Sequence, residues 1–281
     1  MAKLAAKKST SSLDELFREA EKAVLEAGEV LKRYYLNSKQ SELNVRYKGA
    51  IDPVTIADKT AENLIIRRLK SRFPGIKFLC EESCPKDVKE GTFWILDPLD
   101  GTVNFVHHCP IFSTSLALFS DGEILLGIIN DVMRKEFFHA IKNRGAYLNG
   151  EPITVSSSKQ LGRSLLVTGF PYYIREKHNR VIRNFKKLVL AAQGIRRLGS
   201  AALDMAWVAS GRFDGFWEEG LQPWDVGAGS LIVKEAGGKV SDFSGGADWL
   251  FGKRLVASNG KIHPLMIKIL NSKSYKEVSS S

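Results

Sequence analysis

The chain has 281 residues, of which 44% are hydrophobic and 26% are charged, proportions that are ordinary for a globular protein. Its formal net charge is +10, and no apolar run approaches the roughly 18 residues of a transmembrane helix, so no such helix is predicted. Its first residues also lack the apolar stretch of a signal peptide.

Two helices and a strand are predicted in the N-terminal part of the chain. Residues 1–12 form a short basic tail, which we expect to be disordered. Apolar residues then recur at helical spacing and predict a helix over 13–35. A second helix is predicted over 58–72, and a strand over 76–80 follows it.

A buried strand over 93–97 is predicted next, because apolar residues follow one another there. Pro98 is expected to end this strand, since proline donates no hydrogen bond to a ladder. Asp97 and Asp100 would then stand at the carboxyl end of the strand, where ligands of α/β sheets usually bind. The simplest alternative is a turn in which an aspartate only caps the backbone.

Gly101 and Thr102 follow these two aspartates directly. Glycine lets the backbone turn and approach a ligand closely, and a helix that starts at Thr102 would point its free N–H groups at an anion. Carboxylates suit a hard cation, and the N–H groups suit a phosphate. Together they indicate a magnesium-dependent enzyme that acts on a phosphate.

The remaining elements mix strands and helices, as in a fold that layers helices on sheets. Asp121-Gly122 predicts a hairpin, and Asn149-Gly150 predicts another turn. A boundary between two halves is predicted near 155–160. Strands are predicted over 112–119, 124–130, 137–140, 146–148, 164–168, 213–217, 239–242 and 255–257, and helices over 178–192, 201–210, 225–236 and after Pro264.

Further acids lie at the edges of apolar segments. Asp225 is predicted to stand just before a helix whose next residues are small, which lets a ligand approach closely. The alternative for Asp225 is a simple N-cap. Asp58 and Glu81 occupy similar edge positions earlier in the chain. Separated acidic sites of this kind are what a multi-metal cage assembled by folding requires.

Residues 175–197 contain eight lysines and arginines against one acid, Glu176. A helix is predicted over most of this segment, and its basic side chains are expected largely on the outer face: Arg180, Arg183, Lys186 and Lys187. The simplest interpretation is a solvated helix face. Steering of phosphorylated substrates and contact with nucleic acid or an acidic partner are the alternatives.

Three cysteines are present, and an odd number argues against a disulfide framework and favours a reducing cytoplasm. A zinc site is conceivable, but the spacing of its candidate ligands is poor: Cys80, Cys84, His107, His108 and Cys109. We expect Cys80 to fill the end of a strand instead.

These segments together resemble the inositol monophosphatase family, within the superfamily that includes fructose-1,6-bisphosphatases. The segment from Asp97 to Phe105 resembles the family's first signature, and the segment from Trp224 to Gly238 resembles its second. The resemblance implies an α+β fold, a five-layer α-β-α-β-α sandwich with the metal site between an N-terminal half, 13–158, and a C-terminal half, 159–276. One departure is His108, which replaces a glycine that is usual in the family.

The resemblance also implies a set of metal ligands for Mg²⁺. The matching positions are Glu81, Asp97, the backbone carbonyl of Leu99, Asp100 and Asp225.

The resemblance to the family also implies catalytic and substrate-binding residues. Thr102 and Asp58 match the pair that positions and activates the attacking water, and Glu81 belongs with them among the catalytic residues. The N–H groups of Gly101 and Thr102 match the phosphate site. The positions that match the alcohol site are Asp100, Ala201 and Glu218, and Glu82 matches a supporting acid.

The implied function is a magnesium-dependent phosphomonoesterase that hydrolyses inositol 1-phosphate by attack of a metal-activated water. Fructose-1,6-bisphosphatase, histidinol-phosphatase and nucleotide 3′-phosphatase activities are alternatives on the same cage. The resemblance further implies lithium inhibition and a homodimer. A regulatory protein that binds RNA or a transcription partner through the basic helix is the alternative from a different class of function.

Overall fold

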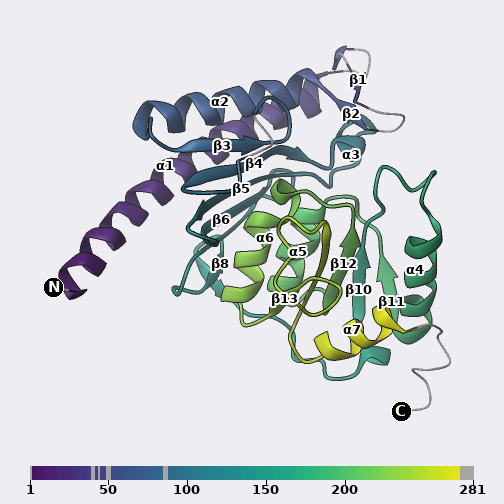
Figure 1. Ribbon diagram of the computed structural model, residues 1–281. Coiled ribbons are helices and arrows are strands. Elements are labelled where there is room, and N and C mark those ends of the chain that lie inside the picture. The colour runs from purple at the N-terminus through teal and green to yellow at the C-terminus, as the bar shows by residue number, and fades with distance from the viewer. Residues whose placement is uncertain (1, 39–41, 44, 49–51, 85–87, 273–281) are drawn as a thin grey trace.

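The computed structural model describes residues 2–272 apart from 39–41, 44, 49–51 and 85–87, with side chains described from Leu13 onward. A seven-stranded and a five-stranded sheet are layered with helices (Figure 1). Helices α1 and α2 cover the outer face of the larger sheet, and α5 and α6 lie between the sheets. Helices α4 and α7 cover the outer face of the smaller sheet. The predicted five-layer α-β-α-β-α sandwich is therefore confirmed.

The predicted helices are all present in the described part of the chain. Their bounds are α1 (Ala2–Asn37), α2 (Ile56–Arg72), α3 (Thr102–Val106), α4 (Asn179–Ala191), α5 (Ala201–Ala209), α6 (Pro223–Glu235) and α7 (His263–Asn271), with a 3₁₀ turn over Leu161–Arg163. Helix α1 begins before the predicted start at Leu13. The disorder predicted for residues 1–12 stays a prediction, because Met1 and the side chains of the following residues lie outside the described part.

The larger sheet has the strand order β3-β4-β5-β6-β7-β8-β9 and is antiparallel except for the parallel pair β3 and β4. Its strands are β3 (Lys77–Cys80), β4 (Phe93–Asp100), β5 (Ser113–Ser120), β6 (Glu123–Asp131), β7 (Glu136–Ile141), β8 (Ala146–Leu148) and β9 (Glu151–Ile153). Both predicted turns are confirmed. Asp121 and Gly122 have φ angles of 51° and 87°, and Asn149 and Gly150 have 51° and 86°, as turns between adjacent antiparallel strands require.

The smaller sheet has the order β11-β10-β12-β14-β13. Its strands are β10 (Leu165–Thr168), β11 (Gly194–Arg196), β12 (Gly215–Glu219), β13 (Lys239–Ser241) and β14 (Arg254–Ser258), and a separate pair is formed by β1 (Arg46–Tyr47) and β2 (Pro53–Val54). Strands β1, β2, β9 and β11, of two or three residues each, were not predicted, although the equally short β8 and β13 were.

Pro98 does not end its strand, contrary to the prediction. Strand β4 continues through Pro98 to Asp100, and its pairing with β5 is irregular between Asp97 and Asp100. The irregularity removes the need for a ladder hydrogen bond from the proline nitrogen. Thr114 instead donates its hydroxyl to the Pro98 carbonyl at 3.0 Å. The two aspartates are therefore held inside a fully buried strand end rather than in a loose turn.

The chain passes from one sheet to the other between Ile153 and Leu165. The predicted division of the chain at 158 and 159 falls within this connection. That these halves are separate domains stays a prediction, and residues 273–276 of the second half lie outside the described part.

One hydrophobic core lies between the two sheets around α5 and α6, and another lies between the larger sheet and helices α1 and α2. Glycine permits the closest contact in the first of these cores. A Cβ at Gly127 in β6 would stand 2.7 Å from the carbonyl oxygen of Ala228 in α6. Among the described residues, no helix combines the length and the apolar character that crossing a membrane demands.

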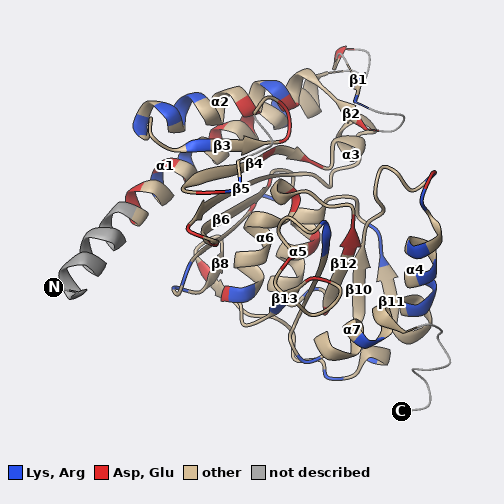
Figure 2. Ribbon diagram, in the orientation of Figure 1, with Lys and Arg blue, Asp and Glu red and all other residues tan. Residues whose placement is uncertain are grey.

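Basic residues lie along helix α4 (Figure 2), but one of them is not where it was predicted. Lys187 lies on the inner face rather than the outer face and is only 3% exposed. Its ammonium group donates to the carbonyl oxygen of Ile269 at 3.3 Å and also to that of Ser272, so it joins α4 to the end of α7. Conversely, Ile182 and Val189 are exposed.

Candidate active site

A cavity of about 350 Å³ lies where β4 ends and where α5 and α6 begin. It is lined by residues from both halves of the chain. The predicted site residues that line it are Glu81, Asp100, Gly101, Ala201, Glu218 and Asp225. The others are buried behind them in the adjoining structure: Asp58, Asp97, Leu99 and Thr102. The structure therefore brings acids that are far apart in the sequence to one place.

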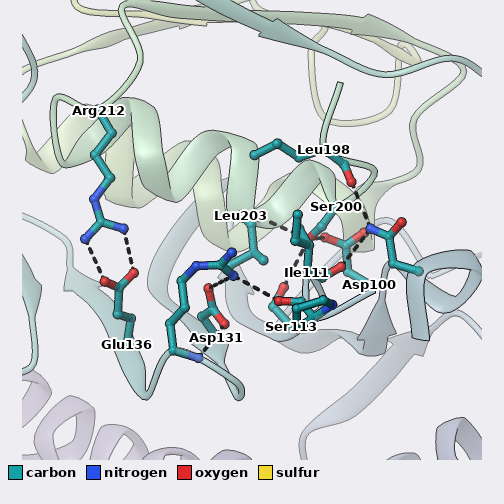
Figure 3. Close-up of polar contacts among 12 residues, drawn as sticks. Asp100, Ile111, Ser113, Asp131, Glu136, Leu198, Ser200, Leu203 and Arg212 are labelled. Carbon is teal, nitrogen blue, oxygen red and sulfur yellow. Dashed lines mark hydrogen bonds and ion pairs between the residues drawn. The ribbon is translucent and has the colours of Figure 1, made fainter. Parts of the chain in front are cut away.

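Asp97 and Asp100 are held at the end of β4 by backbone N–H groups. One oxygen of Asp97 accepts a hydrogen bond from the Leu99 N–H at 3.0 Å. One oxygen of Asp100 accepts from the Ala202 N–H at 2.8 Å and from the Ser200 hydroxyl, as Figure 3 shows in part. Asp100 thus belongs to the first half but is anchored on the start of α5 in the second.

Asp58 and Thr102 are in direct contact. Asp58 is in the first turn of α2, and its Oδ2 accepts hydrogen bonds from the Thr55 N–H at 2.9 Å and the Thr55 hydroxyl at 2.5 Å. The Thr102 hydroxyl lies 3.1 Å from Asp58 Oδ1 and 3.0 Å from the Leu99 carbonyl oxygen. Because a hydroxyl carries one proton, Thr102 can donate to either of these acceptors.

Gly101 begins α3 in the left-handed conformation, with a φ of 96°. A Cβ at this position would stand 2.9 Å from the carbonyl oxygen of Ile111, so a larger residue would be strained and crowded. Asn104 then donates to the carbonyl oxygens of Ile111 and Leu198, each at 2.8 Å (Figure 3). His108 adopts a φ of 54°, so this turn keeps a glycine-like conformation although glycine is replaced.

Asp225 lies in the first turn of α6 rather than before the helix, which corrects the prediction. Pro223 starts the helix, and one oxygen of Asp225 accepts a hydrogen bond from the Gln222 N–H at 2.7 Å. The N-cap is Gln222, so the N-cap alternative is wrong for Asp225, which instead completes the capping box from the third helical position. A carboxylate has two oxygens with several lone-pair sites, so capping with one does not prevent the other from binding a ligand.

Glu81 follows β3 and pairs with a residue that the sequence did not indicate. The Lys48 ammonium lies 2.8 Å from an oxygen of Glu81 and 2.5 Å from an oxygen of Glu82. Glu62, which is 1% exposed, accepts the N–H of Glu82 at 3.0 Å and so holds this segment from behind. Glu62 lies one helical turn after Asp58, and this spacing was the only signal for it.

The acids of the site have raised pKa values. Burial raises the pKa of Asp58 to about 6. Burial also raises the pKa of Asp97 well above its usual value, and the neighbouring charges of Glu81, Asp100 and Asp225 act in the same direction. Asp225 is shifted upward for the same two reasons, so its pKa also lies well above the usual value. Ionising these groups together therefore requires a compensating positive charge.

The chemistry of these side chains suits a hard divalent cation, because every candidate ligand presents oxygen and the buried like charges favour a cation between them. In the part of the chain that the structure describes, no three His, Cys, Asp or Glu side chains are already arranged to hold an ion. Glu81 is engaged with Lys48 instead. The residues fit a cation by their chemistry, and Glu81 meets Lys48 through one of its two carboxylate oxygens.

Cys80 and Cys84 form a disulfide, so the prediction that the cysteines are unpaired is wrong for them. The strand end and the loop after Glu82 bring their Cα atoms to 5.0 Å, which is within disulfide reach. Cys109 is a free cysteine. The disulfide encloses Glu81 and Glu82, and it is therefore part of the local structure that positions a candidate ligand.

Comparison with known proteins agrees with this architecture. The model of the inositol monophosphatase family matches residues 12–275. An inositol-1-monophosphatase of Mesorhizobium japonicum is 39% identical over 247 residues, which are 88% of this chain and 92% of that protein. The Nus factor SuhB of Escherichia coli K12 is 39% identical over 249 residues, with the same coverage of each chain.

A solved structure agrees as well. The extragenic suppressor protein SuhB of Bartonella henselae superposes with a TM-score of 0.87 at 38% identity, covering 92% of this chain and 99% of that one. The layered fold with acids at the junction of its halves is that of a sugar-phosphatase-like enzyme. The chain belongs to the inositol monophosphatase family and is a phosphatase.

Proposed function

We propose that the protein is a magnesium-dependent phosphomonoesterase that hydrolyses inositol 1-phosphate, or a similar polyol phosphate, to the free alcohol and phosphate. The observation that carries this proposal is the convergence of acids from four separate segments on one cavity, beside the Thr102–Asp58 pair. Mg²⁺ would neutralise the phosphate charge and lower the pKa of a water molecule. The residues that would hold it are Glu81, Asp97, the carbonyl of Leu99, Asp100 and Asp225.

In this proposal Thr102 and Asp58 prepare the nucleophile. The Thr102 hydroxyl orients the attacking water, and Asp58, 3.1 Å behind it, receives the proton through this hydrogen bond. The raised pKa of Asp58, about 6, makes it a better base near neutral pH than an ordinary aspartate. The contact of Asp58 with Thr55 keeps its carboxylate in place.

The rest of the cavity binds the two parts of the substrate. The N–H groups of Gly101 and Thr102 at the start of α3 bind the phosphate. Ala201 leaves room for the alcohol, and Asp100 and Glu218 accept hydrogen bonds from its hydroxyl groups. A polyol therefore fits this wall better than an apolar alcohol.

The test is phosphate release with and without Mg²⁺ from a panel of four esters: inositol 1-phosphate, fructose 1,6-bisphosphate, histidinol phosphate and adenosine 3′,5′-bisphosphate. We expect magnesium-dependent release, with inositol 1-phosphate turned over best. A preference for another ester would keep the reaction and reassign the substrate. If phosphate is released from none of these esters at saturating Mg²⁺, the proposed function is wrong.

A second candidate function is contact with RNA or a transcription partner, and one surface favours it. The outer face of α4 combines exposed Ile182 and Val189 with the exposed basic residues Arg183 and Lys186. A relative is named a Nus factor. Charge reversal at Arg183 and Lys186 should weaken RNA binding in a mobility-shift assay and leave phosphate release unchanged. Lithium inhibition, a homodimer and a cytoplasmic location stay predictions.

A further inference from the structure

Asp204 is a buried acid in the cavity to which the proposed reaction assigns no task. It lies in the first turn of α5, is 1% exposed and lines the cavity together with Glu218 and Ala201. Within the described residues, neither of its carboxylate oxygens has a hydrogen-bond partner. Buried polar groups in folded proteins are nearly always hydrogen-bonded, so an acid of this kind at a cavity wall points to a partner supplied by a ligand.

Asp204 stands at a recess of the cavity wall, and both of its carboxylate oxygens are buried there. Ala201 precedes Asp204 by one helical turn on the same face of α5, so only a small side chain borders the acid on that side. Glu218 enters from β12 and rests against Gly169, where a Cβ would stand 2.1 Å from the Glu218 carboxylate. Glycine at 169 is therefore what allows the Glu218 carboxyl to lie at this wall.

The electrostatics of the recess favour hydroxyl groups over anions or apolar groups. The charges of Glu218 and Asp100 both act on Asp204 and, after burial itself, raise its pKa. Arg197 is the cation that acts in the opposite direction on all three acids. A second anion here would be repelled, whereas a hydroxyl group can donate to an ionised carboxyl or accept from a protonated one.

We propose that Asp204 and Glu218 form a two-point hydroxyl-binding site for the alcohol part of the substrate, in which Asp204 selects polyols with two hydroxyl groups in reach. This inference rests on the proposed function, because it assigns the polyol its binding wall. Asp204 then determines specificity and touches no reacting atom. Its loss should weaken binding of the polyol and leave the phosphate half of the site intact.

The experiment compares two ligands that share a phosphate and differ in the alcohol. The first is inositol 1-phosphate, whose KM is measured at saturating Mg²⁺, and the second is inorganic phosphate, whose inhibition constant is measured in the same assay. We expect Asp204→Ala to raise the KM about tenfold or more while the inhibition constant changes less than about twofold. Asp204→Asn, which keeps the shape, should raise the KM by a smaller factor.

Asp131→Asn is the matched control, since Asp131 is also a fully buried acid but lies outside the cavity and pairs with Arg134 (Figure 3). It should leave both constants unchanged even if its melting temperature falls. An equal rise in both constants for the Asp204 variants, or no rise in KM, would overturn the inference and leave the proposed function standing.

Phenyl phosphate separates the remaining outcomes. If the wild type releases phosphate from phenyl phosphate but not from inositol 1-phosphate, the phosphatase assignment holds and the polyol site is overturned. If it releases phosphate from neither of these esters nor from the rest of the panel, the proposed function fails, and this inference fails with it.

Discussion

At the scale of single residues, three aspartates of the cavity region help to hold helix starts, and the proposed function gives each of them a second task. Asp58, Asp100 and Asp225 each give one oxygen to a backbone N–H group at the start of a helix. These bonds hold the side chains in one orientation, because the helix ends need acceptors in any case. Capping and ligand binding are therefore not rival explanations for these residues.

Thr102→Val tests the proposed proton path. Valine has nearly the shape of threonine but cannot bridge the water and Asp58, so we expect phosphate release to fall about 100-fold or more. Thr102→Ser keeps the hydroxyl and is the matched control, for which we expect most of the rate to remain. Equal rates for the Val and Ser variants would rule out a role for this hydroxyl.

Gly169→Ala tests the position of the Glu218 carboxyl. A methyl group there would collide with this carboxyl, so we expect a higher KM for the polyol ester and a loss of about 1–3 kcal/mol in the free energy of unfolding. Gly75→Ala is the control, since a Cβ at 75 meets no atom within 4 Å. If the two variants behave alike in both assays, Glu218 does not depend on Gly169.

At the scale of elements, long periodic segments could be predicted and short or irregular ones could not. Helix α2 and strands β5 and β6 lie close to their predicted ranges because their apolar patterns are long. Pro98 misled the prediction, because an irregular ladder is a property of two strands and not of one. Strand β11 was not predicted because its residues, Gly194 to Arg196, contain only one apolar side chain.

The acidic site could be predicted only in part, because only some of its residues lie in sequence motifs. Asp97, Asp100 and Asp225 lie in recognisable motifs, and the structure brings Asp100 and Asp225 to the cavity wall with Asp97 behind it. Lys48 carries no motif, and its partner Glu81 lies on a different segment. No role for Asp204 could be predicted from the sequence, because its lack of a hydrogen-bond partner is a property of the folded cavity wall.

The Cys80–Cys84 disulfide allows a prediction at this scale. It encloses Glu81, so opening it should loosen a proposed metal ligand and raise the Mg²⁺ concentration for half-maximal rate by about two- to fivefold. Cys84→Ser, or a dithiol reductant, should have this effect, whereas Cys109→Ser should not. An unchanged Mg²⁺ requirement in Cys84→Ser would show that the disulfide does not position Glu81.

At the scale of the whole molecule, the site depends on contact between the two halves. Asp100 in the larger sheet accepts its hydrogen bonds from α5, and Asn104 binds the Leu198 carbonyl of the second half (Figure 3). The cavity exists only when both halves are packed together. Folding, metal binding and catalysis should therefore respond together to changes in charge at this junction.

The pH dependence of stability follows from the raised pKa values. Burial raises the pKa of Asp58 from 3.8 to about 6 and that of Glu218 from 4.5 to about 8, so the folded chain binds these protons more tightly than the unfolded chain. Without a divalent cation, the free energy of unfolding should therefore decrease as the pH rises from about 4 to about 8.

Magnesium should oppose such a loss at its own proposed ligands, because it binds their ionised form. Burial also raises the pKa of each of these acids: Glu81, Asp97, Asp100 and Asp225. We expect the increase in melting temperature on adding MgCl₂ to be several degrees larger at pH 8 than at pH 5, relative to NaCl of equal ionic strength. An equal increase at both pH values would mean that Mg²⁺ does not compete with protons at these carboxyls.

The central claim is that the buried carboxylates form a magnesium-dependent phosphatase site, and Asp97→Asn tests it most directly. Phosphate release from inositol 1-phosphate should be measured with saturating Mg²⁺ for the wild type, for Asp97→Asn and for Asp121→Asn, a control in an exposed turn. We predict a loss of about 100-fold or more for Asp97→Asn alone, with a melting temperature that is unchanged or higher without Mg²⁺ because one like charge is gone. Wild-type turnover in a folded Asp97→Asn variant would contradict the account.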